Sequence, residues 1–306
     1  MRTAILIPCC NEGSTIGKVT KDFQAALPEA IVYVYDNNST DLTVENATKA
    51  GAVVRRHREQ GKGNVVRRMF ADVDADIYVL VDGDDTYDAS SSRDLIRLLR
   101  EERLDFVNAA RFSTDDHAYR PGHRFGNRAI STLVQLVFGS EFTDILSGYR
   151  VFSRRFVKSF PGRSTGFEIE TELAVHALEV GMPYEERSVQ YRERPTGSVS
   201  KLHTVRDGFR ILLFIARLMK DERPLQFFLL AGVILAAIGI GLGLPVVATY
   251  LETGTVPRLP TAVLSLGLVL LASLCAVTGL ILDVVTKTRR EMKRLAYLSI
   301  PSISEH

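Results

Sequence analysis

The 306-residue sequence contains no tryptophan and only three cysteines. Cys9 and Cys10 are adjacent and Cys275 lies far away in an apolar run, so the spacing fits neither a metal site nor a disulfide framework. Reduced cytosolic thiols are expected. The formal net charge of +2 defines no partner by itself, and we expect no nucleic acid to bind. Apolar residues make up 46% of the chain, which is enough for a large core.

Charge is missing altogether from one long segment in the last third of the chain. The run "LQFFLLAGVILAAIGIGLGLPVVATYL", residues 225–251, would form a helix of roughly 40 Å, which is enough to cross a bilayer. A second run, residues 259–285, is charged only at Asp283. Soluble helices rarely lack a polar face over such a length. We therefore predict a transmembrane hairpin over 225–286 rather than two buried helices.

Basic residues flank this hairpin and predict its orientation. Before the first span lie Arg217, Lys220 and Arg223. After the second span lie Lys287, Arg289, Arg290, Lys293 and Arg294. The connecting loop contains only Arg258. Positive residues stay on the cytoplasmic side, so we expect the N-terminal domain and the tail 287–306 in the cytoplasm, at the inner membrane. Residues 203–224 predict an amphipathic helix in the membrane interface. Gly239, Gly241 and Gly243 could join two copies of the chain.

The region before the hairpin, residues 1–202, alternates apolar β-rich runs with helical ones. The runs "AILIPCC", "IVYVYD", "AVVRRHR" and "DIYVLVD" are separated by segments with helical character. This order predicts βαβ units and a mostly parallel sheet covered by helices on both faces. Ligands of such sheets bind beyond the carboxyl ends of the strands. Asp36 and Asp82 each end a strand, so both carboxylates should face one crevice.

The stretch "LVDGDDTYD" places four acidic residues directly behind an apolar strand. Asp82 and Asp84 have the spacing of two carboxylates that can jointly hold Mg²⁺ or Mn²⁺ together with diphosphate oxygens. A calcium loop is excluded, because Tyr87 and Arg93 stand where glycine and glutamate are needed. The alternative is a turn with a helix cap, a role that suits Asp88.

Seven segments together resemble family 2 glycosyltransferases of GT-A fold, and more narrowly the polyprenyl-phosphate sugar transferases typified by dolichyl-phosphate mannose synthase. They occur in order over roughly two hundred residues and precede the apolar hairpin: "IPCCNEGSTI", "VYDNNSTD", "GKGNVVRRMF", "VDGDDTYD", "FTDILSGYRVF", "GFEIETEL" and "YRERPTGSVSKL". The resemblance implies a Rossmann-like cytoplasmic domain that transfers a sugar from a nucleotide-sugar to polyprenyl phosphate, with inversion and with a divalent metal.

The resemblance also implies roles for individual residues. Those expected at the nucleotide are Pro8, Asn11, Glu12, Asp36 and Asp41. Those expected near the phosphates are Lys62 and two arginines, chosen here as Arg128, which shares the segment "RFGNR" with Arg124, and Arg150. A loop carrying Arg194, Ser200 and Lys201 would close over donor and lipid phosphate, although it has one residue more than the family pattern. Glu172 matches the family's acid in "GFEIETEL", with either a role in acceptor-site polarity or a structural one.

The acceptor determines whether a general base is needed. A lipid phosphate is already ionised near neutral pH, since its second pKa is about 6. A sugar hydroxyl on another lipid or glycan would need a base, for which Asp144 and Glu172 are the candidates. Thr86 stands where the mannose synthases often have glutamine, which favours a UDP-sugar donor.

Other functions remain to be weighed against this one. A processive polysaccharide synthase is disfavoured, because such enzymes usually carry a Gln-x-x-Arg-Trp sequence and this chain has no tryptophan. A membrane scaffold without catalytic activity would be expected to have lost the acidic pair or the arginines, and all are present. A nucleotidyltransferase with a similar sheet would be separated from the transferase by its release of diphosphate.

Overall fold

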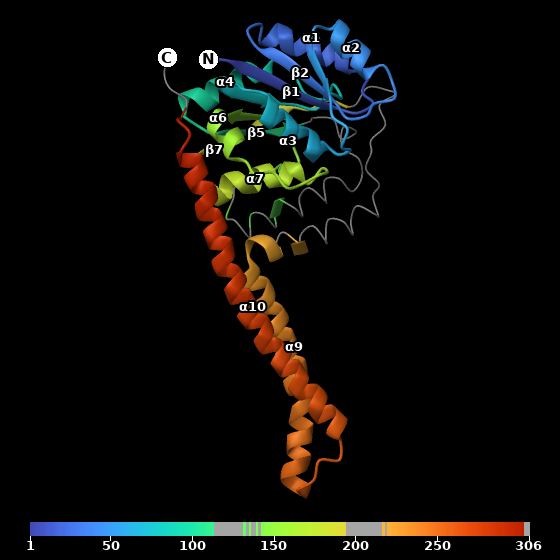
Figure 1. Cartoon of the computed structure of the whole chain (residues 1–306), viewed down its shortest axis with the longest axis vertical. Coiled ribbons are helices and arrows are strands. Elements are labelled where there is room, and N and C mark those ends of the chain that lie inside the picture. Colours follow the sequence, from blue (N-terminus) through green and yellow to red (C-terminus); the bar gives the residue numbers. More distant parts are fainter. Residues whose placement is uncertain are drawn as a thin grey trace. The chain divides into compact units, whose positions relative to one another are not determined.

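The structure is a computed structural model that describes residues 1–112, 131–132, 135, 139, 142–193, 216–217 and 219–302. The chain divides into two compact units, which are described one at a time below (Figure 1). The first unit comprises Met1–Ile211 and Met292–His306, and the second comprises Leu212–Glu291.

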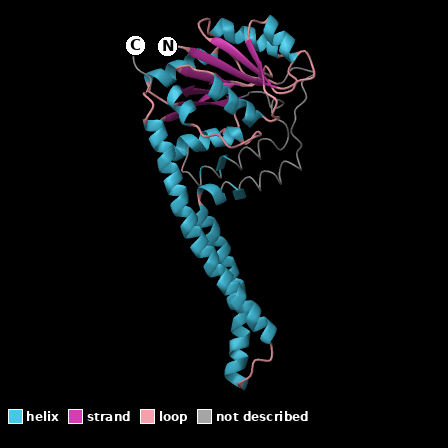
Figure 2. Ribbon diagram, viewed as in Figure 1, coloured by secondary structure: helices cyan, strands magenta, loops and turns pink. Residues whose placement is uncertain are grey.

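A seven-stranded sheet forms the centre of the first unit, with the strand order β3-β2-β1-β4-β6-β5-β7 (Figure 2). Its strands are β1 Thr3–Cys9, β2 Ile31–Asp36, β3 Val53–Arg56, β4 Ile77–Leu80, β5 Phe106–Phe112, β6 Arg150–Ser153 and β7 Tyr184–Gln190. All neighbouring pairs are parallel except the two that involve β6. The mostly parallel sheet predicted from the alternating pattern is therefore confirmed.

The register of the sheet brings the predicted strand-end residues to one edge. Cys9 at the end of β1 pairs with Asp36 at the end of β2. On the other side of β1, Leu6 pairs with Leu80 at the end of β4, two residues before Asp82. Because these three strands are parallel, their carboxyl ends meet at the same edge of the sheet.

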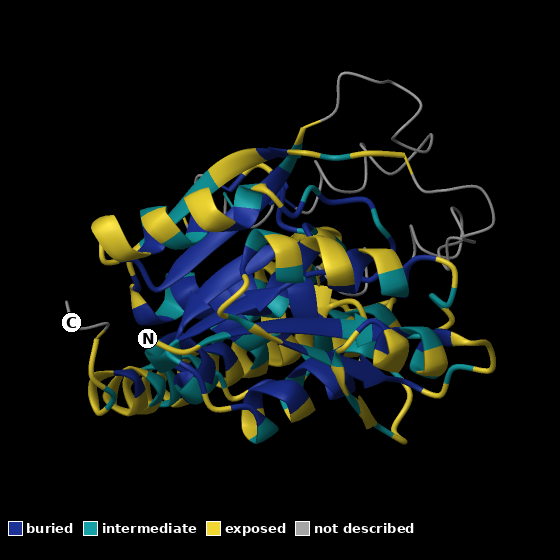
Figure 3. Cartoon of the chain, turned by 90° about the horizontal axis from the view of Figure 1, so that it is seen from above, coloured by how far each residue is buried: buried dark blue, intermediate teal, exposed yellow. Residues whose placement is uncertain are grey.

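Helices cover both faces of this sheet (Figure 3). On one face lie α1 Ile16–Ala26, α2 Thr43–Lys49 and α4 Ser91–Glu101, which share a core with alternate β1 residues; Ile5, Phe23 and Leu95 belong to it. On the other face lie α3 Lys62–Asp72, α6 Arg154–Ser159 and α7 Ile169–Val180. There Phe70 of α3 makes edge contacts with Tyr78 and Phe152. Burial of these side chains is the main force that holds the layers together.

The last residues of the chain also belong to the first unit. The Tyr297 hydroxyl donates to Asp105 Oδ2 at 2.7 Å, and the Arg155 guanidinium lies 4.5 Å from the Tyr297 ring centroid. Lys293 pairs with the buried carboxylate of Glu179 at 2.5 Å. These contacts fix Lys293 and Tyr297 to the surface formed by α6, α7 and the start of β5.

The second unit contains α9, Pro224–Thr253, and most of α10, Leu259–Leu298. Both helices are long and apolar enough to cross a membrane, and the predicted spans 225–251 and 259–285 lie within them. Most of their large apolar side chains are exposed; Leu264 and Leu274, for example, are 56% and 61% accessible.

Small residues bring α9 and α10 together. A side chain at Gly239 would meet Ser265 O, Leu268 and Val269 of α10, and Ser265 Oγ donates to Gly239 O at 2.7 Å. Gly243 lies against the Ser265 hydroxyl. Two of the three glycines expected to join copies of the chain are thus used within the hairpin, and only Gly241 faces open space.

Candidate active site

Two loops at the carboxyl edge of the sheet are joined by hydrogen bonds. Asn11, which follows β1 and has a φ of 53°, donates its N–H to Ser39 Oγ at 2.8 Å and accepts from Thr40 N at 2.8 Å. The N–H of Glu12 donates to Thr43 Oγ1 at 2.9 Å. Pro8, half-buried, precedes this loop on β1. The loops after β1 and β2 are therefore joined at the carboxyl edge of the sheet, where the sequence predicts the nucleotide.

Asp41 also links the loop after β1 to the loop after β2. Its carboxylate accepts from Gly13 N at 2.9 Å, Thr43 N at 3.0 Å and the Thr43 hydroxyl at 2.5 Å. Partial burial raises the pKa of Asp41, but these hydrogen bonds outweigh it and leave the pKa below its ordinary value. The carboxylate that was expected at the base and ribose thus has its oxygens engaged in the loop.

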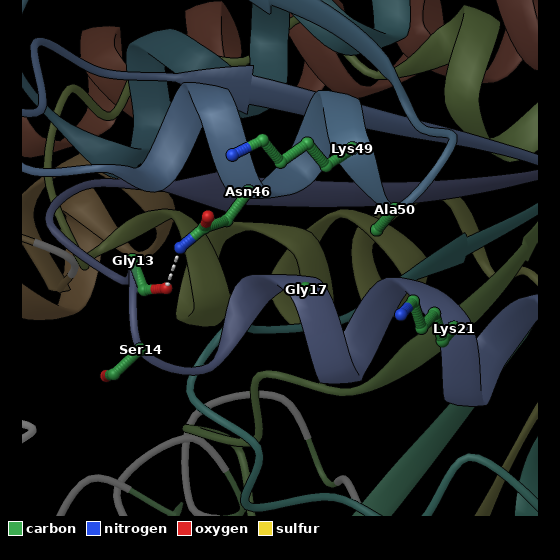
Figure 4. A pocket seen from close by; sticks show the side chains of 7 residues that line it. All are labelled: Gly13, Ser14, Gly17, Lys21, Asn46, Lys49 and Ala50. Atoms are coloured by element: carbon green, nitrogen blue, oxygen red, sulfur yellow. Dashed lines mark hydrogen bonds between the residues drawn. The ribbon is translucent and has the colours of Figure 1, made fainter.

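The same loop is tied to α2 by Asn46, whose side-chain amide donates to Gly13 O at 2.7 Å (Figure 4). A groove of about 230 Å³ opens beside this contact, between α1 and α2, and Lys21 and Lys49 lie along it. Lys49 is paired with Glu45 at 2.7 Å. The groove lies beside the helices and contains none of the predicted site residues.

Asp36 is buried at the carboxyl end of β2. It is 3% exposed, and its Oδ1 accepts from Ser39 N at 3.2 Å. The next residue, Asn37, donates to Glu59 O at 2.8 Å and to His57 O at 3.2 Å, and accepts from Gly61 N at 2.7 Å. Asn37 therefore fixes the loop that leads to Lys62. Sequence reasoning gave Asn37 no role, because its partners lie some twenty residues further along the chain.

Lys62 lies between two carboxylates from distant parts of the sequence. Its Nζ is 2.5 Å from Asp82 Oδ1 and 2.6 Å from Glu170 Oε1. The side chains of Lys62 and Glu170 are each 11% exposed, and that of Asp82 is 26% exposed. Burial disfavours the charge on Lys62, but attraction to both carboxylates outweighs it and raises the pKa of Lys62 above its ordinary value. Lys62 is thus a charged ammonium beside the acidic pair.

The carboxylates of Asp82 and Asp84 differ in their surroundings. Asp84 is 3% exposed, and its Oδ1 accepts from the Thr86 hydroxyl at 2.6 Å. Asp82 is more exposed, and a side chain at Gly148 would collide with its carboxylate, so this glycine makes room for it. The next acid, Asp85, has a φ of 59° and pairs with Lys18 at 2.6 Å.

The carboxylates of Asp82 and Asp84 are ligands that suit a hard divalent cation. Within the part of the chain that the structure describes, no group of three or more His, Cys, Asp or Glu side chains could hold a metal. Magnesium and manganese need no such group when the substrate provides phosphate oxygens, because one or two carboxylates then complete the site. Asp82 and Asp84, two positions apart at the strand end, fit that requirement.

Asp144 is bound by an arginine that sequence reasoning overlooked. Arg111 Nε and Nη2 each lie 2.7 Å from an oxygen of Asp144, and Arg111 N donates to the same carboxylate at 2.9 Å. The guanidinium also lies 5.6 Å from the ring centroid of Tyr191. The signal in the sequence is a basic residue within the mostly apolar strand "FVNAARF". This two-pronged pair fixes the orientation of Asp144.

Arg150 is fully buried, with 0% exposure. Its two terminal nitrogens donate to the backbone carbonyls of Glu170 and Ile145, and its guanidinium lies 5.6 Å from the Phe106 ring centroid. Burial lowers the pKa of Arg150 from its usual value. The arginine expected at the phosphates therefore joins β6 to the start of α7, directly behind the Lys62 cluster.

Glu172 holds the segment that precedes α7. It accepts from Arg163 N and Ser164 N, both at 2.8 Å. The next carbonyl, Thr165 O, accepts from Gly63 N at 3.0 Å at the start of α3. Side chains at Gly61 and Gly63 would collide with this segment. Glycine at these two positions therefore lets the backbone of residues 164–165 pack closely against the start of α3. The described contacts of Glu172 are thus with backbone N–H groups.

The structure brings part of the predicted site together. Lys62, Asp82 and Asp84 lie with Asp36 at one sheet edge, and the loop of Asn11 and Glu12 borders it. The remaining predicted residues, Arg124, Arg128, Arg194, Ser200 and Lys201, lie outside the described residues, as do residues 203–215 of the predicted interfacial helix.

The fold is that of a GT-A-like domain. The crystal structure of glucosyl-3-phosphoglycerate synthase from Mycobacterium tuberculosis in complex with Mn²⁺, UDP-glucose and glycerol 3-phosphate superimposes with a TM-score of 0.56. The match covers 72% of this chain and 79% of the other, at 21% identity, and thus concerns the fold.

Residues 4–160 match the family model for glycosyl transferase family 2, and the chain belongs to this family. Glycosyltransferase AglJ of Haloferax volcanii is 35% identical over 301 residues, which covers 96% of this chain and 97% of the relative. A dolichyl-phosphate hexose transferase of the same organism is 27% identical over 221 residues, covering 72% of this chain and 95% of that relative. The chain is therefore a nucleotide-sugar glycosyltransferase, and the resemblance found in the sequence is confirmed.

Proposed function

We propose that this protein transfers a hexose from a nucleotide-sugar, preferably a UDP-sugar, to polyprenyl phosphate at the cytoplasmic face of the inner membrane, with inversion at the sugar. The observation that carries the proposal is the cluster of Lys62, Asp82 and Asp84 at the sheet edge, in a chain that also has two helices able to cross a membrane. The dolichyl-phosphate hexose transferase among its relatives supports a lipid phosphate as acceptor.

On the donor side, the crevice would hold the nucleotide between the loop of Asn11 and Glu12 and the end of β2. Asp36 would accept a hydrogen bond from the base, and Pro8 would line the pocket. Asp41 would act indirectly, because its hydrogen bonds shape the loop. A UDP-sugar donor is favoured by Thr86. It is also favoured by the UDP-glucose bound to glucosyl-3-phosphoglycerate synthase, which has a similar fold.

Asp82 and Asp84 would hold Mg²⁺ or Mn²⁺, and the synthase of similar fold binds Mn²⁺. The cation, when bound, would stabilise the negative charge that develops on the leaving diphosphate. Lys62 would add a second positive charge to the same leaving group. Arg150 would keep α7 and its Glu170 in place behind Lys62. Arg128 and the loop with Arg194, Ser200 and Lys201 would complete the phosphate site.

On the acceptor side, the nucleophile would be an already ionised phosphate oxygen, so no strong base is needed. The geometry agrees with this, since both oxygens of Asp144 are engaged by Arg111. Asp144 would then hold Arg111 in position near the acceptor phosphate. Glu172 would shape the acceptor side through the segment 163–165.

The decisive experiment incubates membranes that contain the protein with undecaprenyl phosphate and a panel of UDP- and GDP-sugars, with Mn²⁺ or Mg²⁺. We expect one sugar to become linked to the lipid, nucleoside diphosphate to be released and EDTA to stop the reaction. Sugar transferred only to a glycan or lipid hydroxyl, with none on the lipid phosphate, would overturn the proposal.

A further inference from the structure

The cation that Asp82 meets in this structure is the ammonium of Lys62. At 2.5 Å, Nζ and Asp82 Oδ1 are in direct contact as a charge-assisted pair. A Mg²⁺ ion bound to this carboxylate would lie about 2.0 to 2.1 Å from its oxygen. Two positive charges on the same carboxylate oxygen would repel each other strongly in a partly buried site. The ammonium and a metal ion therefore compete for Asp82.

Glu170 gives Lys62 a second partner that does not depend on the metal. It is 2.6 Å from Nζ, it is as buried as Lys62, and the Arg150 guanidinium holds the backbone carbonyl of the same residue. Glu170 lies at the start of α7, far in sequence from the strand end that carries Asp82. Lys62 can therefore leave Asp82 without becoming an unpaired buried charge.

We propose that Lys62 occupies the cation position beside Asp82 while the donor is absent, and that the nucleotide diphosphate moves its ammonium onto phosphate, which frees Asp82 for the incoming divalent ion. Glu170 is the positioning residue that retains Lys62 during this exchange. The inference rests on the proposed function, because it takes the diphosphate donor and the metal from there.

The binding of the metal ion and the binding of the nucleotide diphosphate should therefore be coupled. Metal alone must displace Lys62 from Asp82 and leave the ammonium facing the new charge, so it binds weakly. Metal that arrives with a diphosphate brings an anion to which Lys62 can transfer. Each ligand therefore strengthens the binding of the other by the same factor, as linkage requires. A lysine with a purely structural role would leave metal binding independent of nucleotide.

The test measures Mn²⁺ binding by the purified full-length protein in detergent, with and without UDP or GDP, from the electron paramagnetic resonance signal of free Mn²⁺. In the unchanged protein we expect nucleotide to tighten Mn²⁺ binding by about tenfold or more. In Lys62→Met, we expect Mn²⁺ alone to bind more tightly than in the unchanged protein, and the gain from nucleotide to fall to about threefold or less.

Two further variants keep the test decisive. Lys62→Met leaves Asp82 and Glu170 without their shared cation, so Lys62→Met/Glu170→Gln, which removes one of those charges, is measured beside it and should show the same loss of coupling. Lys18→Met is the matched control, because Lys18 pairs with Asp85, next to the acidic pair, and is 53% exposed. It should keep the coupling of the unchanged protein.

The outcomes separate the two proposals. Coupling that stays the same in Lys62→Met and in the double variant overturns the inference and leaves the proposed transfer reaction intact. Failure of the unchanged protein to bind Mn²⁺ even with nucleotide overturns the inference and the metal site together, whereas the sugar transfer itself is judged by the product on the lipid.

Discussion

In the first unit, charged side chains such as Arg150 and Lys62 are enclosed together with their partners, whereas in the second unit large apolar side chains such as Leu264 and Leu274 face outward. The first pattern is stable in water only because each buried charge has a fixed partner. The second is the pattern expected of helices in apolar surroundings such as the interior of a bilayer. The two units therefore bury different kinds of side chain, and substitutions can test each pattern separately.

The largest effect is expected for Asp82 and Asp84, the proposed metal ligands in the first unit. Asp84→Ala removes one of two proposed metal ligands and should lower the rate of sugar transfer by about a hundredfold to a thousandfold, because stabilisation of the leaving diphosphate is lost. The rate is measured as labelled sugar appearing on lipid phosphate. Asp94→Asn, which changes an exposed acid on α4, should leave the rate unchanged. Undiminished transfer by Asp84→Ala would refute the metal site.

A substitution of Arg150 tests whether the hydrogen bonds of a buried charge stabilise the first unit. Arg150→Met should lower the free energy of unfolding by about 3 kcal/mol, since it leaves the carbonyls of Glu170 and Ile145 buried without their donor. Thermal or denaturant unfolding followed by circular dichroism gives the measurement. Arg187→Met, which alters an arginine that is 57% exposed, should change stability by less than about 0.5 kcal/mol. Equal losses for the two variants would show that enclosure is unimportant here.

The second unit can be disturbed by overfilling its helix contact. Gly239→Leu should destabilise the hairpin by roughly 1 to 3 kcal/mol, because a side chain there collides with Ser265 O and Leu268. Gly241→Leu is the matched control, since nothing lies within 4 Å of its added carbon. Both changes replace a helical glycine by leucine, so differences in helix propensity cancel. Unfolding in detergent micelles should separate the two variants.

Tyr297 tests a smaller contact, at the point where the end of the chain joins the first unit. Tyr297→Phe removes the hydrogen bond to Asp105 and should lower the free energy of unfolding by about 1.5 kcal/mol. Tyr250→Phe, on the exposed surface of α9, should have no measurable effect. Comparing the thermal midpoints of the two variants in the same detergent provides the check.

The smallest expected effect concerns acid stability at Asp41. Its folded-state pKa lies below the ordinary value, so its contribution is present above about pH 4 and is lost as the pH falls through the folded pKa. Asp41→Asn should therefore lower stability at neutral pH by less than about 1 kcal/mol, because solvent screens this exposed group. The difference from the unchanged protein should shrink towards pH 3. A difference that grows in acid would contradict this account.

Local patterns in the sequence predicted the sheet, the hairpin and the acidic strand end, because periodicity and strand-end position are local properties. They did not predict that β6 inserts antiparallel between β4 and β5, since "RVFS" is short and its partners are distant in sequence. The pairs Lys62 with Glu170 and Arg111 with Asp144 were missed for the same reason. Glu172 and Asp41 show a further limit, because a carboxylate that accepts backbone N–H groups has the same sequence signature as one that binds a ligand.

Because residues from Met292 onward belong to the unit that also contains Met1–Ile211, the unit with the two apolar helices is an insertion into it rather than an appendage. The first unit is therefore assembled from two separate stretches of the chain, and the Tyr297 hydroxyl reaches Asp105 across 192 positions of sequence. A chain shortened after Ile211 would lack the Tyr297 and Lys293 contacts, so the complete first unit requires the residues on both sides of the apolar helices.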